Sequence, residues 1–287
     1  MEAARLQRLP SATVRGQLVL AGSLVGLAAI AWVISSGRMD GMDMGPGSDL
    51  GGFGFYIVTW VVMMAAMMFP SVVPMVSVYR RLARDKPGHE GATGFLLSGY
   101  LITWAAAGVV AYGLFEIGKA VAGDALAWDK AGQAVAVAVL VVAALYELTP
   151  LKHACLRRCR SPLSFFMESW RDGRGGALVM GLKHGAWCVG CCWALMAALF
   201  ALGVMSLTWM ALVAALIAVE KLLPWRIAAM GAVTAVLLLL AVGLAASPAD
   251  VPGLTVPMDS SGMDQGGMHQ GGMHKGGMKP DGMDMSR

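Results

Sequence analysis

Residues 226–246 read RIAAMGAVTAVLLLLAVGLAA, and no charged side chain follows Arg226 in this stretch. A helix that crosses a bilayer needs about 20 mostly apolar residues, so the stretch predicts a membrane span. The chain as a whole has the same character, because 57% of its residues are hydrophobic, 14% are charged and the mean hydropathy is +0.64. An integral membrane protein is therefore expected.

Six other segments have a similar length and composition, so we expect an all-α fold, a polytopic transmembrane helix bundle with about seven spans. The first has a basic start, as in a signal peptide, but its apolar run is longer than such peptides carry and no clear cleavage site precedes Gly37. It is read as a retained helix. A turn near Gly203 alone separates the fifth and sixth segments. The seven are roughly 17–36, 55–78, 95–115, 131–149, 185–203, 205–222 and 226–246.

The basic residues predict the orientation of these spans. With a cytoplasmic N-terminus, 16 of the 22 Lys and Arg residues fall on the cytoplasmic side, as membrane proteins prefer. The chain then divides into a cytoplasmic segment 1–16, a transmembrane domain 17–246 and an extracytoplasmic tail 247–287. The basic residues at the cytoplasmic ends of the spans explain the net charge of +4, so nucleic acid is not an expected partner.

The tail carries a methionine repeat of period five. Such a sequence buries too little apolar surface to fold alone, so we expect a flexible segment. Thioether sulfur and neutral imidazole are both ligands for copper, and a similar stretch, MDGMDMGPG, occupies residues 39–47. The alternative is a solvated tail without a ligand, although exposed methionine oxidises readily. The candidate ligands of the repeat are Met268, His269, Met273 and His274.

Four methionines lie in the middle of the second predicted span, in the stretch WVVMMAAMMFPSVVPM at residues 60–75. Met63, Met64, Met67 and Met68 are spaced three and four apart, which places them on adjacent faces of a helix. Pro70 and Pro74 are expected to kink it. The sulfurs are candidate metal ligands, but methionine is also a common filler of irregular packing gaps.

The five cysteines form two groups, each beside a histidine. In HGAWCVGCCWALM, residues 184–196, the helical spacing brings one histidine and three cysteines to one face. In KHACLRRCR, residues 152–160, two cysteines lie one turn apart. Thiolates select copper(I), zinc or iron–sulfur clusters, whereas a single membrane cysteine is commonly a small packing residue. The candidates are His184, Cys188, Cys191 and Cys192 in the first group and His153, Cys155 and Cys159 in the second.

Two further features lie near the cytoplasmic side of this topology. Residues 162–170, PLSFFMESW, predict a short helix at the membrane interface. Glu147 and Glu220 lie near the inner ends of their spans, where pairing with Lys or Arg is the simplest role and a proton or cation role is the alternative.

Three stretches together resemble a bacterial family of predicted metal-binding integral membrane proteins. They are WVVMMAAMMFP at 60–70, YELTPLKHACLRRCRSP at 146–162 and GAWCVGCCWALM at 185–196. The resemblance covers roughly residues 55–246 and implies a multi-spanning, copper-chaperone-like metal-binding protein. The methionine-rich tail of this chain favours copper in addition.

These observations predict a copper(I)-binding protein of the bacterial inner membrane and not an enzyme. Zinc is the second choice of metal. Copper would be gathered by the Met/His tail, pass the methionine span and reach the thiolates, for acquisition, transfer or delivery to a membrane cuproenzyme or a copper chaperone. A membrane-embedded thiol–disulfide oxidoreductase is the alternative from another class, and a structural subunit of a membrane complex is the third.

Overall fold

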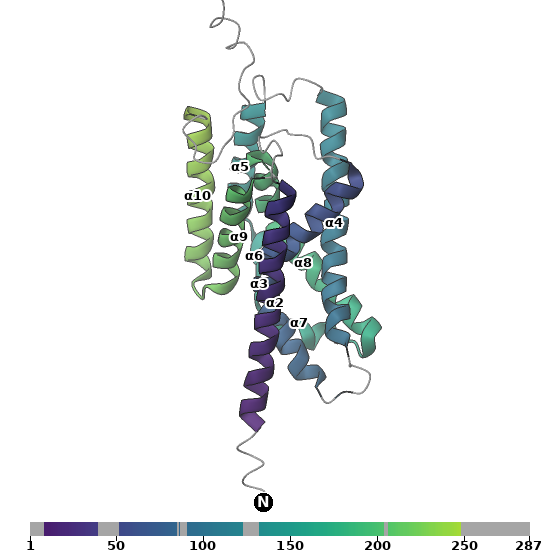
Figure 1. Ribbon diagram of the computed structural model, residues 1–287. Helices are drawn as coiled ribbons and strands as arrows, with labels where there is room; N and C mark the ends of the chain where they lie inside the picture. Colours follow the sequence, from purple (N-terminus) through teal and green to yellow (C-terminus); the bar gives the residue numbers. More distant parts are fainter. Residues whose placement is uncertain are drawn as a thin grey trace, which may run out of the picture. The chain divides into compact units, whose positions relative to one another are not determined.

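The protein is described here by a computed structural model, which covers residues 9–39, 52–84, 86, 91–122, 132–203 and 206–247. All regular secondary structure in these ranges is helical, which confirms the expected fold class (Figure 1). All of these described residues belong to one compact unit. The helices are α2 (Leu9–Met39), α3 (Phe53–Ala83), α4 (Ala92–Ala122), α5 (Gln133–Glu147), α6 (Pro150–Arg160), α7 (Pro162–Ser169), α8 (Gly173–Leu202), α9 (Leu207–Leu222) and α10 (Arg226–Ala246).

Five of the described helices are long and apolar enough to cross a membrane, namely α2, α3, α4, α8 and α10. Helices α5 and α6 are bent by 67° and make a sixth span if they are taken together. Helix α9 has 16 residues, fewer than the roughly 20 that a full crossing needs. The described residues therefore support five or six spans, and the count of about seven is not confirmed.

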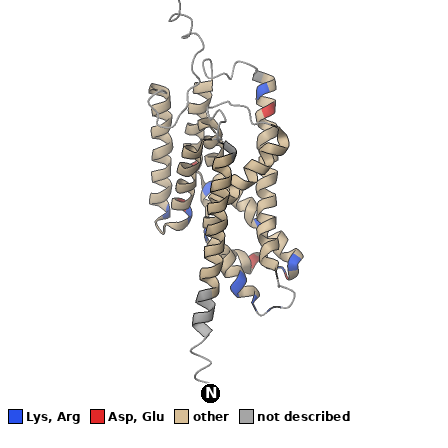
Figure 2. Ribbon diagram, in the orientation of Figure 1, with Lys and Arg blue, Asp and Glu red and all other residues tan. Residues whose placement is uncertain are grey.

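Apolar side chains cover the outside of the helices that could cross the membrane. Val33 of α2 is 71% exposed, and Ile227 and Leu239 of α10 are 77% and 71% exposed. Water would disfavour apolar patches of this kind, whereas lipid chains do not. Figure 2 shows more Lys and Arg in the lower half of the helices than near their upper end, an asymmetry of the kind that the positive-inside rule predicts. The assignment of that end to the cytoplasm stays a prediction.

Helix α8 packs most extensively on α4, and glycines allow the close approach. A Cβ atom on Gly181 of α8 would collide with the carbonyl oxygen of Leu96, and one on Gly99 of α4 would collide with that of Leu178. Small residues let membrane helices approach to backbone contact. This contact fixes the helix that carries three of the five cysteines.

Helix α8 is longer than the fifth predicted span. It begins at Gly173, which has a φ of 76°, and not near Gly185. Cys188, Cys191 and Cys192 therefore lie near the middle of a 30-residue helix and not at its start. The short helix expected at 162–170 is present as α7.

Candidate metal centre

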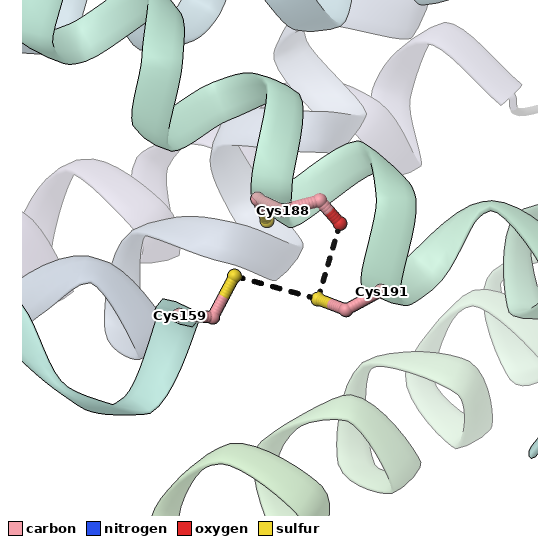
Figure 3. A group of neighbouring side chains, drawn as sticks. All are labelled: Cys159, Cys188 and Cys191. Carbon is pink, nitrogen blue, oxygen red and sulfur yellow. Dashed lines mark hydrogen bonds between the residues drawn. The ribbon is translucent and has the colours of Figure 1, made fainter. Parts of the chain in front are cut away.

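Three cysteine side chains from two helices meet in the protein interior. The sulfur atoms of Cys159 on α6 and of Cys188 and Cys191 on α8 all lie within 4.8 Å of one another (Figure 3). The Sγ atoms of Cys159 and Cys191 are 3.6 Å apart. Cys188 and Cys191 are buried, and Cys159 is half-buried. All five cysteines of the chain are free thiols.

The local sequence explains how each helix presents its thiol. Cys188 and Cys191 are three residues apart and so share a face of α8. The Sγ atom of Cys192 lies 3.4 Å from that of Cys191 and is buried beside it. The chain bends between α5 and α6, where Thr149 caps α6 by accepting a hydrogen bond from the backbone N–H of Lys152 at 3.3 Å. Pro150 follows at the first helical position, which suits its fixed φ.

Cys188 has two polar neighbours from other helices. The Lys221 ammonium on α9 donates a hydrogen bond to its sulfur at 3.0 Å, and the Tyr100 hydroxyl on α4 lies 3.1 Å away. An ammonium group at this distance compensates the negative charge of a thiolate, the form that binds metal. Four helices therefore converge on this site, namely α4, α6, α8 and α9.

A buried ion triad holds α6 in place. The ammonium of Lys152 donates to Glu147 Oε1 at 2.7 Å and to Glu220 Oε2 at 2.8 Å, and the three side chains are at most 1% exposed. The charge pairing expected for both glutamates is present. Glu147 Oε2 and Glu220 Oε1 have no hydrogen-bond partner among the described residues. The triad connects α5, α6 and α9 and so positions the helix that carries Cys159.

Cys192 adjoins the three-sulfur group without belonging to it, and Cys155, His153 and His184 also lie outside that group. Cys155 is buried against Gly190, where an added Cβ would lie 3.0 Å from its sulfur. The ring of His184 is 4% exposed and lies between Tyr100 and Phe165, and its Nδ1 atom has no hydrogen-bond partner among the described residues. His153 is half-buried.

The methionines of α3 line the core and approach the cysteines at one point. Met63, Met64, Met67 and Met68 are at most 4% exposed and belong to the same buried cluster as Cys188. Burial alone fits a packing role as well as a ligand role. Met68 is distinguished by its sulfur, which accepts a hydrogen bond from Lys221 at 3.8 Å. Met268, His269, Met273 and His274 and the stretch 40–47 lie outside the described residues.

Sequence reasoning did not identify Lys221 and Tyr100 as parts of the site. From the sequence, Lys221 is one of the 16 basic residues assigned to the cytoplasmic side. A usable signal was present, because Glu220 and Lys221 are the only charged residues between 207 and 223, and charges within apolar segments mark functional candidates. Tyr100 carried no comparable signal, since its contact with Cys188 depends on the packing of α4 on α8.

The three-sulfur group fits a soft metal ion. A bond between a thiolate and such an ion is about 2.3 Å long, so sulfurs that share one ion lie about 3.8 to 4.6 Å apart, depending on the coordination geometry. The observed group needs only small side-chain adjustments to meet that spacing. Thiolates bind copper(I) and zinc in preference to hard cations.

The fold and the thiol group define an all-helical protein with several candidate membrane spans and a buried site suited to metal. Residues 57–244, more than half of the chain, match the model of the PpoB2 family, described as a copper chaperone. The chain belongs to this copper chaperone family. No curated protein and no solved structure gives a significant match. The family supports a metal-binding role without catalysis.

Proposed function

We propose that this protein binds copper(I) in the bacterial inner membrane and passes it to a further acceptor, a membrane cuproenzyme or another copper chaperone. The observation that carries this proposal is the convergence of Cys159, Cys188 and Cys191 from two helices. Sulfur-only ligation suits copper(I), and membership of a copper chaperone family favours copper over zinc.

The proposed path begins in the Met/His tail and continues along the methionines of α3. Many weak ligands on one tether raise the local concentration of binding sites. Met68 and Cys188 contact the same ammonium group, which supports transfer from thioether to thiolate at this point. Because the cysteines lie near the middle of α8, the site suits transit better than final storage.

A direct test is copper(I) titration of the protein purified in detergent under reducing conditions, with a chromophoric copper(I) chelator as competitor. The variant Cys159→Ser/Cys188→Ser/Cys191→Ser is expected to lose the tightest site. Cys155→Ser is the matched control, since this buried cysteine lies outside the group. Deletion of the tail after Ser260 should lower the stoichiometry and spare the tightest site. Wild-type protein that retains no copper(I) would refute the proposal.

A second candidate function is thiol–disulfide exchange, and the 3.6 Å separation of Cys159 and Cys191 sulfurs favours it. A quinone could take two electrons and two protons from this pair and leave a disulfide. The candidate leaves the methionine-rich tail without a role. Repeated reduction and reoxidation of the pair by quinone, in protein that binds no metal, would support it over copper binding.

A further inference from the structure

The ammonium group of Lys221 lies between the methionines of α3 and the cysteines of α8. It donates to Cys188 Sγ at 3.0 Å, to Ser71 Oγ at 3.5 Å and to Met68 Sδ at 3.8 Å. An ammonium group has three protons to donate and no acceptor, and the described residues supply three partners. Two of these partners are sulfur atoms, a setting that suits a soft cation as well as an ammonium ion.

These contacts place a positive charge where copper(I) would pass from the thioether to the thiolate. Copper(I) and the Lys221 ammonium cannot both lie between Met68 and Cys188, because like charges repel strongly where water is excluded. The thiolate in turn needs a positive partner, since an uncompensated buried charge is unfavourable. The negative charge of the Cys188 thiolate is therefore neutralised by either the ammonium group or a monovalent metal ion, and not by both.

We propose that Met68 and Cys188 form a mixed thioether–thiolate transfer site in which Lys221 occupies the place of copper(I) in the metal-free protein. Copper enters by displacing the ammonium group, one positive charge for another, and the ammonium keeps its protons. The ammonium returns when the metal leaves. This inference rests on the proposed function and adds to it the step that controls loading and release.

The position of Lys221 in α9 allows such a movement. It is the residue before the last one of this helix, where the exposed carbonyl groups carry partial negative charge. A lysine side chain is long and flexible enough to move its ammonium toward the polar end of a helix. At the transfer site Cys188 supplies the single thiolate, so exchange of one charge for one there also favours copper(I) over zinc, because a divalent ion would leave one positive charge uncompensated.

Amine labelling measures the proposed displacement directly. Wild-type protein in detergent is treated with an N-hydroxysuccinimide ester, with and without copper(I), and modification of each lysine is quantified by mass spectrometry. Labelling of Lys221 should rise severalfold on copper loading. Lys183, which is exposed on α8, should be labelled equally in both states. Copper-loaded protein with unchanged labelling of Lys221 would overturn the inference and leave the proposed function intact, whereas failure to bind copper(I) would overturn both.

Release kinetics supply a second measurement. In Lys221→Leu no ammonium returns to the site and no new ligand is introduced, so transfer of copper(I) to a competing chelator should slow by about tenfold. Lys221→Arg keeps the charge and should release copper faster than Lys221→Leu. Release from Lys221→Leu at the wild-type rate would also overturn the inference. If Lys221→Leu does not fold, the change in Lys221 labelling of the wild-type protein on copper loading still tests the inference.

Discussion

The Sγ atoms of Cys159 and Cys191 lie 3.6 Å apart although the two residues are 32 positions apart in the chain. This contact joins the short helix α6 to the middle of α8 and closes the metal site. A disulfide bond is about 2.05 Å long, so a small side-chain rotation would bring the two sulfurs to bonding distance, and an oxidant that takes two electrons and two protons from the thiols would form the bond. The pair therefore reports on whether the site is empty or filled.

Mild oxidation of the metal-free protein with diamide is expected to link Cys159 to Cys191. Copper(I) bound to both thiolates should suppress the reaction, because the ion holds the sulfur atoms and removes their free electron pairs from attack. Peptide mapping by mass spectrometry identifies the linked residues. Formation of the same disulfide at the same rate in copper-loaded protein would contradict ligation by this pair, and Cys155 should remain a free thiol in both samples.

The buried triad gives a prediction about stability. Lys152→Met leaves Glu147 and Glu220 buried without their counter-ion, and breaking a buried ion pair in this way costs about 3–5 kcal/mol. Thermal unfolding in one detergent measures the loss. Copper(I) affinity should fall as well, because α6 carries both Lys152 and Cys159.

Two comparisons separate the buried charge from a general effect of losing a lysine. The surface pair of Lys119 and Glu116 is 3.6 Å apart with both side chains more than 40% exposed, so Lys119→Met should cost at most about 1 kcal/mol. Adding Glu147→Gln and Glu220→Gln to Lys152→Met should recover part of the lost stability. Equal losses of stability in Lys119→Met and Lys152→Met would show that the buried triad contributes no more to stability than a surface ion pair.

The sequence predicted the apolar helices well and their limits less well. Long uncharged runs such as 227–246 are recognisable because the lipid bilayer requires a certain length and composition of a span. The start of α8 could not be recognised from the sequence, because the stretch that contains Arg174, Gly175, Gly176 and Lys183 resembles a polar loop. The close packing of α8 on α4 explains the glycine at position 181, because an added Cβ there would collide with the backbone of α4.

The candidate site was predictable only where it depends on one helix. The spacing of Cys188 and Cys191 shows that they share a face, since helical geometry alone decides it. Cys159 could not be joined to them from sequence, because its position depends on the 67° bend between α5 and α6. Lys221 and Tyr100 reach Cys188 from two other helices, and only tertiary packing brings such residues together.

The close contact of α4 with α8 predicts the effect of a larger residue at Gly181. Gly181→Val would drive a side chain into the backbone of α4 and separate the two helices. The unfolding temperature and copper(I) retention should both fall, because Tyr100 on α4 would move away from Cys188. Gly113→Val is the control on α4, where an added Cβ meets no atom within 4 Å. If Gly181→Val left the unfolding temperature and copper(I) retention unchanged, the tight contact between α4 and α8 would be contradicted.

Met68 offers a test of whether the methionines of α3 carry copper or only fill space. Met68→Leu conserves volume, so its cost in stability should stay below about 1.5 kcal/mol. Loading of the thiol site should slow nonetheless, because the thioether next to Lys221 is gone. Met210→Leu is the matched control, since Met210 is equally buried, on α9, and should load at the wild-type rate. Stopped-flow mixing with a copper(I) complex measures the rates, and equal loading of the two variants would assign Met68 to packing alone.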